Sequence, residues 1–262
     1  MPASPALVVS VVIPVKDDAA ELERCLRALR LQTRAPDEIV VVDNGSSDAS
    51  AQVARTAGAR VIRCDWPGIP AASSAGYDAA TGDIILRLDA DGVPSRDWVH
   101  VFATAFTRRP DVAVFTGGAR FTDGPRRLRK GLAAAYLGAY TAATVPALGH
   151  LPLFGSNLGF RRDAWRSVRG HVHRRDPELH DDLDLAFHLG ERHRIRFLPG
   201  AAMGISMRPF APGAAFGRRI ARGFRTVVVH WPDDFPPMRW VRLLLRRALR
   251  RLGVPPRRRS PR

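Results

Sequence analysis

The sequence predicts an α/β fold in which a doubly wound, mostly parallel central sheet is flanked by helices. Strand-like and helix-like segments alternate from residue 8 to about residue 91 without a hairpin signal, which favours right-handed crossovers between parallel strands. The apolar runs that read as strands are short and almost uninterrupted, as expected of strands buried on both faces. In such sheets, ligands bind at the carboxyl ends of the strands.

The composition supports one globular unit with terminal elaborations. The chain has 262 residues, of which 45% are hydrophobic and 25% charged, so disorder is excluded as its main state. Cys25 and Cys64 are too few for a disulfide framework and lack metal-ligand spacing, which favours a reducing compartment. We expect a main domain over residues 1–208, a helical extension over 209–254 and a disordered basic tail over 255–262.

The first two strand–helix units are defined by their apolar runs and turn residues. Residues 8–15 (VVSVVIPV) predict a buried strand, and the following helix is expected to start with a capping box between Asp18 and Glu21. Residues 38–43 (EIVVVD) predict a second strand. It ends in NGSSD, whose serines can cap a helix over about 48–57.

The remaining elements follow from the same patterns. Residues 57–64 predict a third strand, a small-residue helix ends in the region 76–82, and residues 83–91 (DIILRLDAD) predict a fourth strand. An amphipathic helix follows Ser95. Further along the chain we expect a strand over 112–121, a helix over 125–143, a strand near 157–161, a helix near 180–191, a short strand at 195–198 and helices in the last fifty residues.

Positive charge is concentrated at the C-terminus. The net charge is +16, but residues 239–262 hold ten arginines and no acid, which leaves only +6 on the body. No nucleic-acid partner is expected, because aromatic residues for base stacking are nearly absent among these arginines. On a helical projection, the apolar residues from Val241 to Leu252 occupy an arc of roughly 140°. The arginines of this segment occupy the rest of the helix circumference. Two alternatives stay open: a helix packed on the domain with a solvated arginine face, or a helix lying on anionic lipid.

Neither long apolar segment predicts a targeting or membrane-spanning element. The N-terminal run lacks a preceding basic region, and it reads as a strand rather than a signal peptide. Residues 131–160 are uncharged but rich in Ala and Gly and interrupted by prolines, so they make a poor transmembrane helix. A segment that grazes a membrane surface remains an alternative there.

Carboxylates follow the predicted strands at one edge of the sheet. Asp89 and Asp91 form a DxD element at the end of a buried strand, where both side chains point the same way and can share one Mg²⁺ or Mn²⁺ with a diphosphate. The alternative is a solvated turn. Asp43 ends the second strand and could accept from a pyrimidine or a ribose, or else form an Asx turn. Asp17 and Asp18 follow the first strand in the same way, and one of them is expected only to cap the helix.

A second acidic group lies near the start of the helix predicted over 180–191. The segment HDDLD places Asp181, Asp182 and Asp184 in its first turn. Such carboxylates favour the helix dipole, so a solvated first turn is one interpretation. In the other interpretation, one aspartate acts as general base on an attacking hydroxyl.

Five segments together resemble family 2 glycosyltransferases of the GT-A fold, in order and with the usual spacing. They are VVSVVIPVKDDAAELERCLRAL, EIVVVDNGSSD, AATGDIILRLDADGVPSRDWV, FGSNLGFRRDAW and HDDLDLAFHLGERHRIRFLP. The resemblance covers about residues 8–208, and it is specific because the five segments agree.

The resemblance implies a role for each matching residue. Pro14, Val15, Asp17 and Asp43 would line the nucleotide-base pocket, Asp89 and Asp91 would hold the metal and the ribose or diphosphate, Asp182 would be the catalytic base, and Gly155, Ser156 and Asn157 would form a loop near the donor sugar and acceptor. Trp98 would pack beneath the metal-bearing turn.

The chain departs from the family pattern in three places. An Arg that relatives place near the donor is absent from the matching stretch, residues 72–76. A His that serves relatives as third metal ligand is replaced by Ser206 and Arg208, so the metal has two protein carboxylates only or an arginine neutralises part of the phosphate. His188 stands where relatives usually have Arg, and no role is assigned to it. His171, His173 and His180 are interpreted as polar loop residues.

These observations predict an inverting, metal-dependent glycosyltransferase that uses a nucleoside diphosphate sugar. Two rival functions are a sugar nucleotidyltransferase, which would need a glycine-rich, Arg-bearing loop after the first strand, and a membrane-surface binding protein with an inactive enzyme-like domain. The uncharged segment and the basic tail suggest a lipid-linked acceptor hydroxyl and an anionic membrane surface as partners. We expect the protein in the cytoplasm, peripheral on the inner face of the cell membrane.

Overall fold

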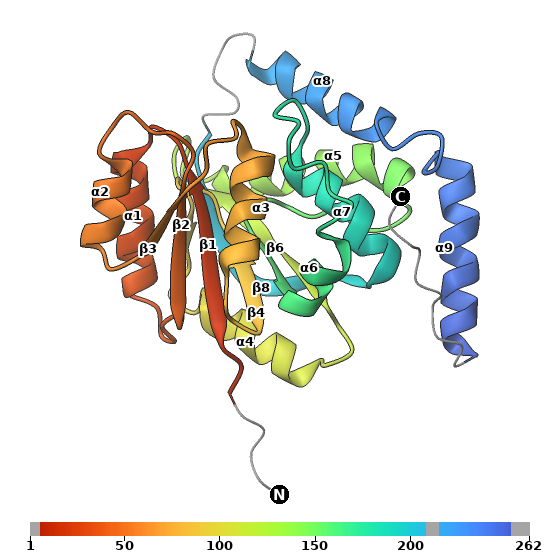
Figure 1. Cartoon of the computed structure of the whole chain (residues 1–262), viewed down its shortest axis with the longest axis horizontal. Coiled ribbons are helices and arrows are strands. Elements are labelled where there is room, and N and C mark those ends of the chain that lie inside the picture. The colour runs from red at the N-terminus through yellow and green to blue at the C-terminus, as the bar shows by residue number, and fades with distance from the viewer. Residues whose placement is uncertain (1–5, 208–214, 253–262) are drawn as a thin grey trace, which may run out of the picture.

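The computed structural model describes residues 6–207 and 215–252, and it confirms a mixed α/β fold built on one large sheet (Figure 1). The strands are β1 (Val9–Val15), β2 (Glu38–Asp43), β3 (Arg60–Arg63), β4 (Ile84–Arg87), β5 (Val93–Pro94), β6 (Val114–Phe121), β7 (Leu158–Arg161) and β8 (Ile195–Ile205). The helices are α1 (Ala19–Arg30), α2 (Ser50–Thr56), α3 (Ile69–Ala79), α4 (Trp98–Arg108), α5 (Arg129–Leu148), α6 (Arg162–Val168), α7 (Asp181–Arg192), α8 (Ala215–Val228) and α9 (Pro236–Arg251). The strand order is β3-β2-β1-β4-β7-β6-β8-β5.

The sheet separates two apolar cores, because side chains alternate along each strand. Val11 and Ile13 of β1 point to the core shared with α1 and α4, whereas Val12 points to the core shared with α3, α6 and α7. Both faces of β1 are therefore fully buried, as its uninterrupted apolar run predicts. Strands β1 to β4 are parallel to their neighbours in this half of the sheet.

Strand β7 runs against the direction of the strands beside it. It lies between β4 and β6 and is antiparallel to both, with Leu158 opposite Arg87. The residues that precede β7 therefore lie beside the carboxyl end of β4. This insertion places the loop over 155–157 next to the DxD element.

The predicted helix caps are wrong, and a single carboxylate replaces them. Asp18 makes no side-chain capping hydrogen bond to α1, and α2 begins after Ala49 rather than after a serine. Instead, Asp48 Oδ2 accepts from the Ala19 N–H at 2.9 Å and Asp48 Oδ1 from the Ser50 N–H at 2.9 Å. One side chain can serve both helices because β1 and β2 are parallel neighbours and both helices begin at the same sheet edge.

Several element boundaries differ from the prediction. The helix expected over 125–143 is α5, which continues through Pro146 and stops at Gly149, whose φ of 72° lies in the left-handed region. The strand expected at 195–198 extends to Ile205 after a register shift against β6 between Gly117 and Gly118. Strand β5 and helix α6 were not predicted. The expected tail over 255–262 lies outside the described residues.

Helix α9 turns three of its arginines toward the protein rather than toward solvent. Arg239 is buried and donates to the Leu148 and Phe187 carbonyl oxygens, each at 2.8 Å. Arg242 and Arg246 pair with Glu191 of α7 at 3.2 and 2.8 Å. The alternative of a packed helix with solvated arginines is therefore wrong for these three residues.

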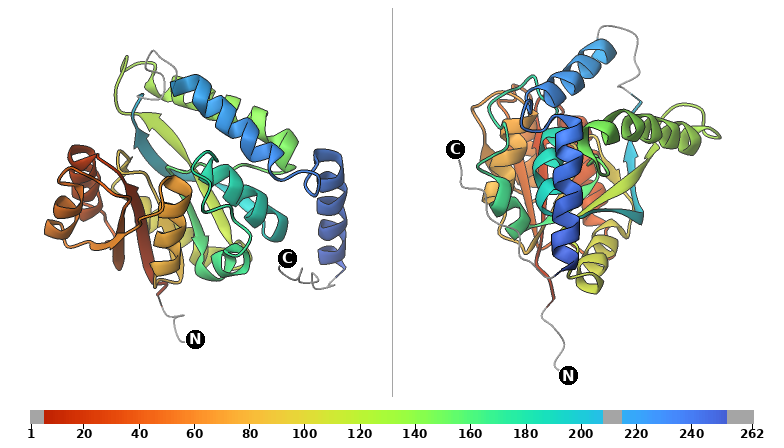
Figure 2. Two further views of the ribbon diagram at one scale, coloured as in Figure 1. Left: turned by 45° about the horizontal axis from the view of Figure 1, so that its top comes forward. Right: turned by 90° about the vertical axis from the view of Figure 1, so that its right-hand side faces the viewer.

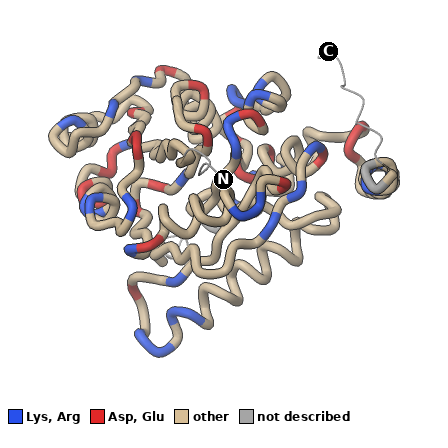
Figure 3. Tube along the Cα trace, turned by 90° about the horizontal axis from the view of Figure 1, so that it is seen from below, with Lys and Arg blue, Asp and Glu red and all other residues tan. Residues whose placement is uncertain are grey.

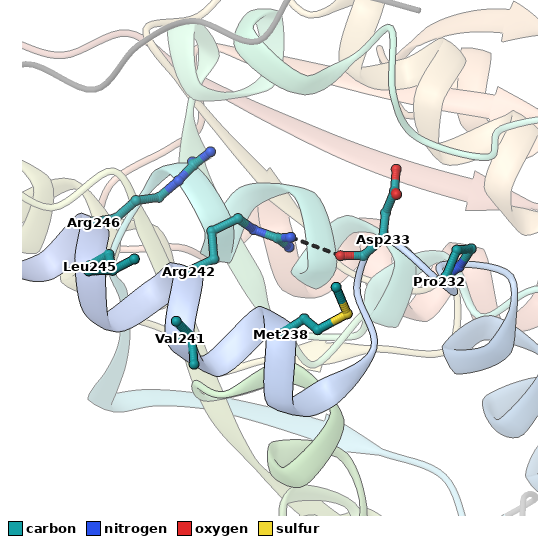
Figure 4. Close-up of a pocket in the computed structure, with 7 residues that line it drawn as sticks. All are labelled: Pro232, Asp233, Met238, Val241, Arg242, Leu245 and Arg246. Atoms are coloured by element: carbon teal, nitrogen blue, oxygen red, sulfur yellow. Dashed lines mark hydrogen bonds between the residues drawn. The ribbon is translucent and has the colours of Figure 1, made fainter.

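Four apolar residues of α9 face outward instead, whereas Leu243 is buried. The side chains concerned are 58–61% exposed: Met238, Val241, Leu244 and Leu245. Figure 4 shows Met238, Val241 and Leu245 at a cavity of about 430 Å³ beside the turn before α9, with Arg242 reaching the Asp233 carbonyl oxygen at 2.8 Å.

Helix α5 lies along the same side of the molecule as α8. Figure 2 shows α8 and α5 at the same end of the molecule, and Arg219 of α8 donates to the Tyr136 hydroxyl of α5 at 3.3 Å. By length and composition α5 could cross a membrane, contrary to the prediction from the sequence. Of the 18-residue apolar window in this helix, 22% is buried. Basic and acidic residues are interspersed over most of the trace (Figure 3).

The close packing of α3 on β1 and β2 yields a stability prediction. A Cβ at Gly76 would collide with the Val12 side chain and lie 2.9 Å from Val42 Cγ2. We expect Gly76→Ala to lower the free energy of unfolding by about 1–3 kcal/mol through overpacking. Gly138→Ala in α5, where a Cβ meets nothing within 4 Å, should leave stability equal or slightly higher. Urea unfolding of both variants measures the difference, and equal midpoints would contradict this packing.

Candidate active site

The carboxyl ends of β1 and β2 form the first part of the site. Val15 is paired with Asp43, and Pro14 with Val42, so the ends of the two strands are level. Asp17 follows β1 with a φ of 50°, and its Oδ1 accepts from the Ser47 N–H at 2.7 Å and the Ser47 hydroxyl at 2.9 Å. These hydrogen bonds lower the pKa of Asp17. They join the β1 end to the turn after β2.

Asp43 takes part in the same turn. Its Oδ1 accepts from the Ser46 N–H at 2.9 Å, which is the Asx turn considered as an alternative, and its side chain is half-buried. The following Asn44 is buried, donates to the Cys64 and Trp66 carbonyl oxygens and accepts from the Gly68 N–H. Asn44 thus holds the segment before α3 against the end of β2.

Arg87 is a buried cation at the end of β4. Its side chain is 2% exposed, and its Nη2 lies 2.8 Å from Asp89 Oδ1 and 3.4 Å from Asp181 Oδ2. The carboxylates raise the pKa of Arg87 above its ordinary range although burial opposes this. A permanent positive charge therefore sits between the DxD element and the start of α7.

Asp181 and Asp182 reach the same place from α7. Asp181 accepts from the Ser73 hydroxyl of α3 at 3.0 Å in addition to its contact with Arg87. Burial raises the pKa of Asp181, and the Arg87 charge opposes that rise. Asp182 Oδ2 accepts from the Gly155 N–H at 2.9 Å. Both residues of the acidic pair thus turn toward β4 rather than only toward solvent.

Gly155 and Ser156 connect the two groups of carboxylates. Gly155 binds Asp182 through its N–H, and the Ser156 hydroxyl donates to Asp89 Oδ2. A Cβ at residue 155 would collide with the Arg87 guanidinium, so the close approach needs glycine. The structure thereby brings Asp89 and Asp182 to opposite ends of one dipeptide.

Asn157 supports this loop from below. It is fully buried, donates to the Gly118 and Ala201 carbonyl oxygens at 2.7 Å and accepts from Trp98 Nε1 at 2.8 Å. Its amide is occupied by these contacts, which makes it a positioning residue. Trp98 lies in the same core cluster as Leu88 and Ala90 of the DxD turn.

Asp89 and Asp91 supply donors that fit Mg²⁺ or Mn²⁺. The pKa of the Cys25 thiol on α1 is raised mainly by burial. The nearby negative charges of Asp91 and Asp89 raise it further. Asp89 is 34% exposed and Asp91 half-buried. Two hard oxygen donors at one strand end suit a divalent ion that keeps waters and binds phosphate. Ser206, which replaces the expected His, donates to Asp123 Oδ2 at 3.0 Å, and Arg208 lies outside the described residues.

Sequence reasoning missed two features of this region. Arg87 was not singled out, although a single basic residue inside the apolar run IILRL is a signal for a buried ion pair. His173 lies in the loop between α6 and α7, as expected, but neither His173 nor His188 was predicted to take part in a cluster. Both side chains meet His230 and Asp184 in one cluster, whereas His171 and His180 stay outside it.

Comparisons with known proteins agree with the fold. Residues 10–169 match the sequence profile described as "Glycosyl transferase family 2". Over 100 residues the chain is 34% identical to glycosyltransferase AglE of Haloferax volcanii, covering 35% of this chain and 33% of that protein. Over 96 residues it is 42% identical to undecaprenyl-phosphate 4-deoxy-4-formamido-L-arabinose transferase of Pseudomonas fluorescens, covering 32% and 27%. The matches thus span about a third or less of these relatives.

A solved structure matches over most of the chain. It is glucosyl-3-phosphoglycerate synthase from Mycobacterium tuberculosis in complex with Mn²⁺, UDP-glucose and phosphoglyceric acid. The TM-score is 0.56 at 22% identity, over 84% of this chain and 80% of the other. At this identity the similarity concerns the fold.

The buried charge of Arg87 yields a second prediction. We expect Arg87→Met to lower the free energy of unfolding by about 3–5 kcal/mol near neutral pH, since Asp181 then remains buried without its cation. The same substitution at Arg63, whose pair with Asp65 is exposed, should change little. Urea unfolding measures both variants.

The loss of unfolding free energy caused by Arg87→Met should depend on pH. Burial holds the folded-state pKa of Asp181 above its ordinary value of 3.8, so the native state binds more protons and gains stability as pH falls through that raised pKa. Without Arg87 this pKa rises further, and the deficit should shrink as pH approaches 3.8. A deficit that stays constant with pH would contradict the assigned role of Arg87.

Proposed function

Because the chain belongs to glycosyl transferase family 2 and has the GT-A fold, it is a glycosyltransferase, and we propose that it moves a sugar from a nucleoside diphosphate sugar to an acceptor hydroxyl with inversion. The observation that carries this proposal is the Gly155–Ser156 dipeptide. It holds Asp182 at its N–H and Asp89 at its hydroxyl, so the assigned base and the assigned donor-binding carboxylate contact the same dipeptide.

The nucleoside end of the donor is assigned to the ends of β1 and β2. Pro14, Val15, Asp17 and Asp43 lie there at one level, joined through the turn over 44–48. A base can stack on the backbone of this turn, and the Asp43 carboxylate can accept from a ring N–H or a ribose hydroxyl. The matching solved structure contains UDP-glucose, which supports a uridine donor as the first to test.

Asp89 and Asp91 would hold Mg²⁺ or Mn²⁺ beside the diphosphate. When bound, such an ion neutralises the negative charge of the diphosphate leaving group. The Arg87 cation lies behind Asp89 and orients its carboxylate through the 2.8 Å contact. The Ser156 hydroxyl holds the second oxygen of the same carboxylate, so its direction is determined from two sides.

Asp182 is assigned as the general base. It takes the proton from the acceptor hydroxyl while that oxygen attacks the anomeric carbon from the face opposite the diphosphate. The bond between the anomeric carbon and the diphosphate breaks, and one displacement inverts the configuration. Asp182 rather than Asp181 is chosen because Asp181 already engages Arg87 and Ser73.

For the acceptor we propose a lipid-linked hydroxyl presented at an anionic membrane surface, with the enzyme peripheral on its cytoplasmic face. Helices α8 and α9 contain no acidic residue. Their exposed apolar side chains include Ile220, Phe224, Leu244 and Leu245, next to the exposed Arg218 and Arg247. Apolar residues bordered by arginines suit an interface with anionic lipid. The undecaprenyl-phosphate named for one relative is consistent with such an acceptor.

The transfer reaction is tested by separating donor binding from catalysis. Nucleoside diphosphate sugars are screened by thermal shift with and without Mn²⁺, and turnover is followed as release of the nucleoside diphosphate. We expect Asp91→Ala to abolish the Mn²⁺-dependent rise in Tm, because one metal ligand is lost. Asp182→Asn should keep that rise but lower kcat by about 10²–10⁴-fold, because only the base is lost.

Asp163→Asn is the matched control, since Asp163 lies exposed on α6 away from the site. It should leave both readouts unchanged. If Asp182→Asn turned over the donor at the wild-type rate, Asp182 would be excluded as the base. A Tm that no sugar nucleotide raises, together with a rise on vesicles, would favour a binding protein with an inactive domain.

Membrane association is tested by sedimentation with vesicles. We expect the wild type to sediment with phosphatidylglycerol vesicles more than with phosphatidylcholine vesicles, and less at high salt, because arginines supply part of the attraction. Leu244→Glu combined with Leu245→Glu should reduce this binding by at least tenfold. Leu31→Glu, at an exposed leucine after α1, is the control. Equal binding of both mutants, or self-association of the wild type without vesicles, would refute a lipid partner for this face.

A further inference from the structure

Four potential metal ligands from three segments meet on the face of α7 that also carries Asp181. Asp184 and His188 lie on α7, His173 precedes α7 in the loop after α6, and His230 follows α8. One ligand atom from each residue can be chosen so that all four lie within 4.8 Å of one another. Asp184 Oδ1 lies 2.6 Å from His173 Nδ1, 3.3 Å from His230 Nε2 and 3.6 Å from His188 Nε2.

The cluster contains buried nitrogen atoms that the protein does not satisfy. The His230 side chain is 2% exposed and that of Asp184 5%. His230 Nε2 and His188 Nε2 are both buried and have no hydrogen-bond partner among the described residues. Buried polar atoms are rarely left unpaired, because each costs the free energy of its lost hydration. Both nitrogens face Asp184.

The surrounding hydrogen bonds orient these side chains as ligands. His230 Nδ1 lies 2.7 Å from the Thr226 carbonyl oxygen, which assigns the proton to Nδ1 and leaves the lone pair on Nε2. Asp184 Oδ2 accepts from the His173 backbone N–H at 2.9 Å, which leaves Oδ1 toward the histidines. A ligating histidine whose other nitrogen donates to a carbonyl, beside an oriented carboxylate, is the usual arrangement around metals.

The three imidazole rings lie close together around Asp184. Their centroids are 5.0–6.0 Å apart. Three ring nitrogens and one carboxylate oxygen are therefore gathered at one point.

We propose that His173, Asp184, His188 and His230 bind one divalent transition-metal ion, with Zn²⁺ as the preferred ion. Three imidazole nitrogens and one carboxylate oxygen suit Zn²⁺ better than Mg²⁺, which takes oxygen donors. With Zn–N distances of about 2.0–2.1 Å, tetrahedral ligand atoms lie about 3.3 Å apart. The 3.3 and 3.6 Å separations of His230 and His188 from Asp184 Oδ1 are close to that spacing. His173 Nδ1 lies 2.6 Å from the same oxygen, as in a hydrogen bond, so these two atoms must move apart when the ion binds.

Four protein ligands leave no open position, so this site is structural rather than catalytic. It would tie the loop before α7, α7 itself and the turn between α8 and α9 to one point. Asp182 lies half a helical turn before Asp184, so the ion would also help to hold the helix that carries the proposed base. The site is independent of the DxD element and of the proposed reaction.

The test measures zinc directly. The full chain is stripped with EDTA, dialysed, titrated with ZnCl₂ and passed through gel filtration before its zinc content and Tm are measured. We expect the wild type to retain one Zn²⁺ per chain and to gain about 5 °C or more in Tm at a hundredfold excess over Kd. Co²⁺ in place of Zn²⁺ should give the visible absorption of a four-coordinate site.

Variants assign the ion to these side chains. His188→Gln and His230→Gln should each lose the retained zinc and the rise in Tm. Asp91→Ala, in the DxD element, and His100→Gln, at an exposed histidine of α4, should keep both. A stripped wild type that takes up no zinc and shows no Co²⁺ absorption would overturn the proposal even if the variants fail to fold. Zinc retained equally by His188→Gln and His230→Gln would overturn it as well.

Discussion

The ion pairs of Arg87 are the constraint on which the rest of the site depends. A guanidinium that is 2% exposed requires carboxylate partners, and it finds them in Asp89 of the DxD turn and Asp181 of α7. These two acids come from distant parts of the chain, so the buried charge determines how α7 meets the sheet. Gly155 completes the arrangement, because only a residue without a side chain can pass this close to the guanidinium. The DxD turn and the helix that carries the acidic pair are thus held together by one cation.

The antiparallel strand explains why the dipeptide lies where it does. In a wholly parallel sheet, the residues before a strand lie at the edge opposite to the ligand-binding edge. Because β7 is reversed between β4 and β6, its preceding loop reaches the carboxyl end of β4. Asn157, the last residue of that loop, is fixed from three sides by Trp98, Gly118 and Ala201. The reversed strand and the buried amide together place two hydrogen-bond donors between two carboxylates.

The parallel half of the sheet could be predicted from the sequence, because β1, β2 and β4 are mainly apolar runs with acidic residues at or shortly after their ends. This pattern is visible within a few positions. The match to the family profile over residues 10–169 confirms the family, and the observed sheet confirms the fold. Other features depend on pairing between distant segments: the reversal of β7, the shared cap from Asp48 and the partners of Arg87. The histidine cluster could not be predicted, because the spacing of these residues along the chain has no metal signature. His173, His188 and His230 meet only after α7 packs against the turn that follows α8.

Helix α9 is oriented by its ion pairs, together with the buried Leu243. Arg239, Arg242 and Arg246 point into the protein toward Asp234 and Glu191, and the rotation of the helix about its own axis is therefore set by ion pairs with particular partners. A rotation by one residue, about 100°, would break all of these pairs. The outward residues have no such specific partners, so leucine, methionine or isoleucine would serve equally there. Over evolutionary time the apolar identities on α9 can drift freely, while Glu191 and the inward arginines must be retained or change together.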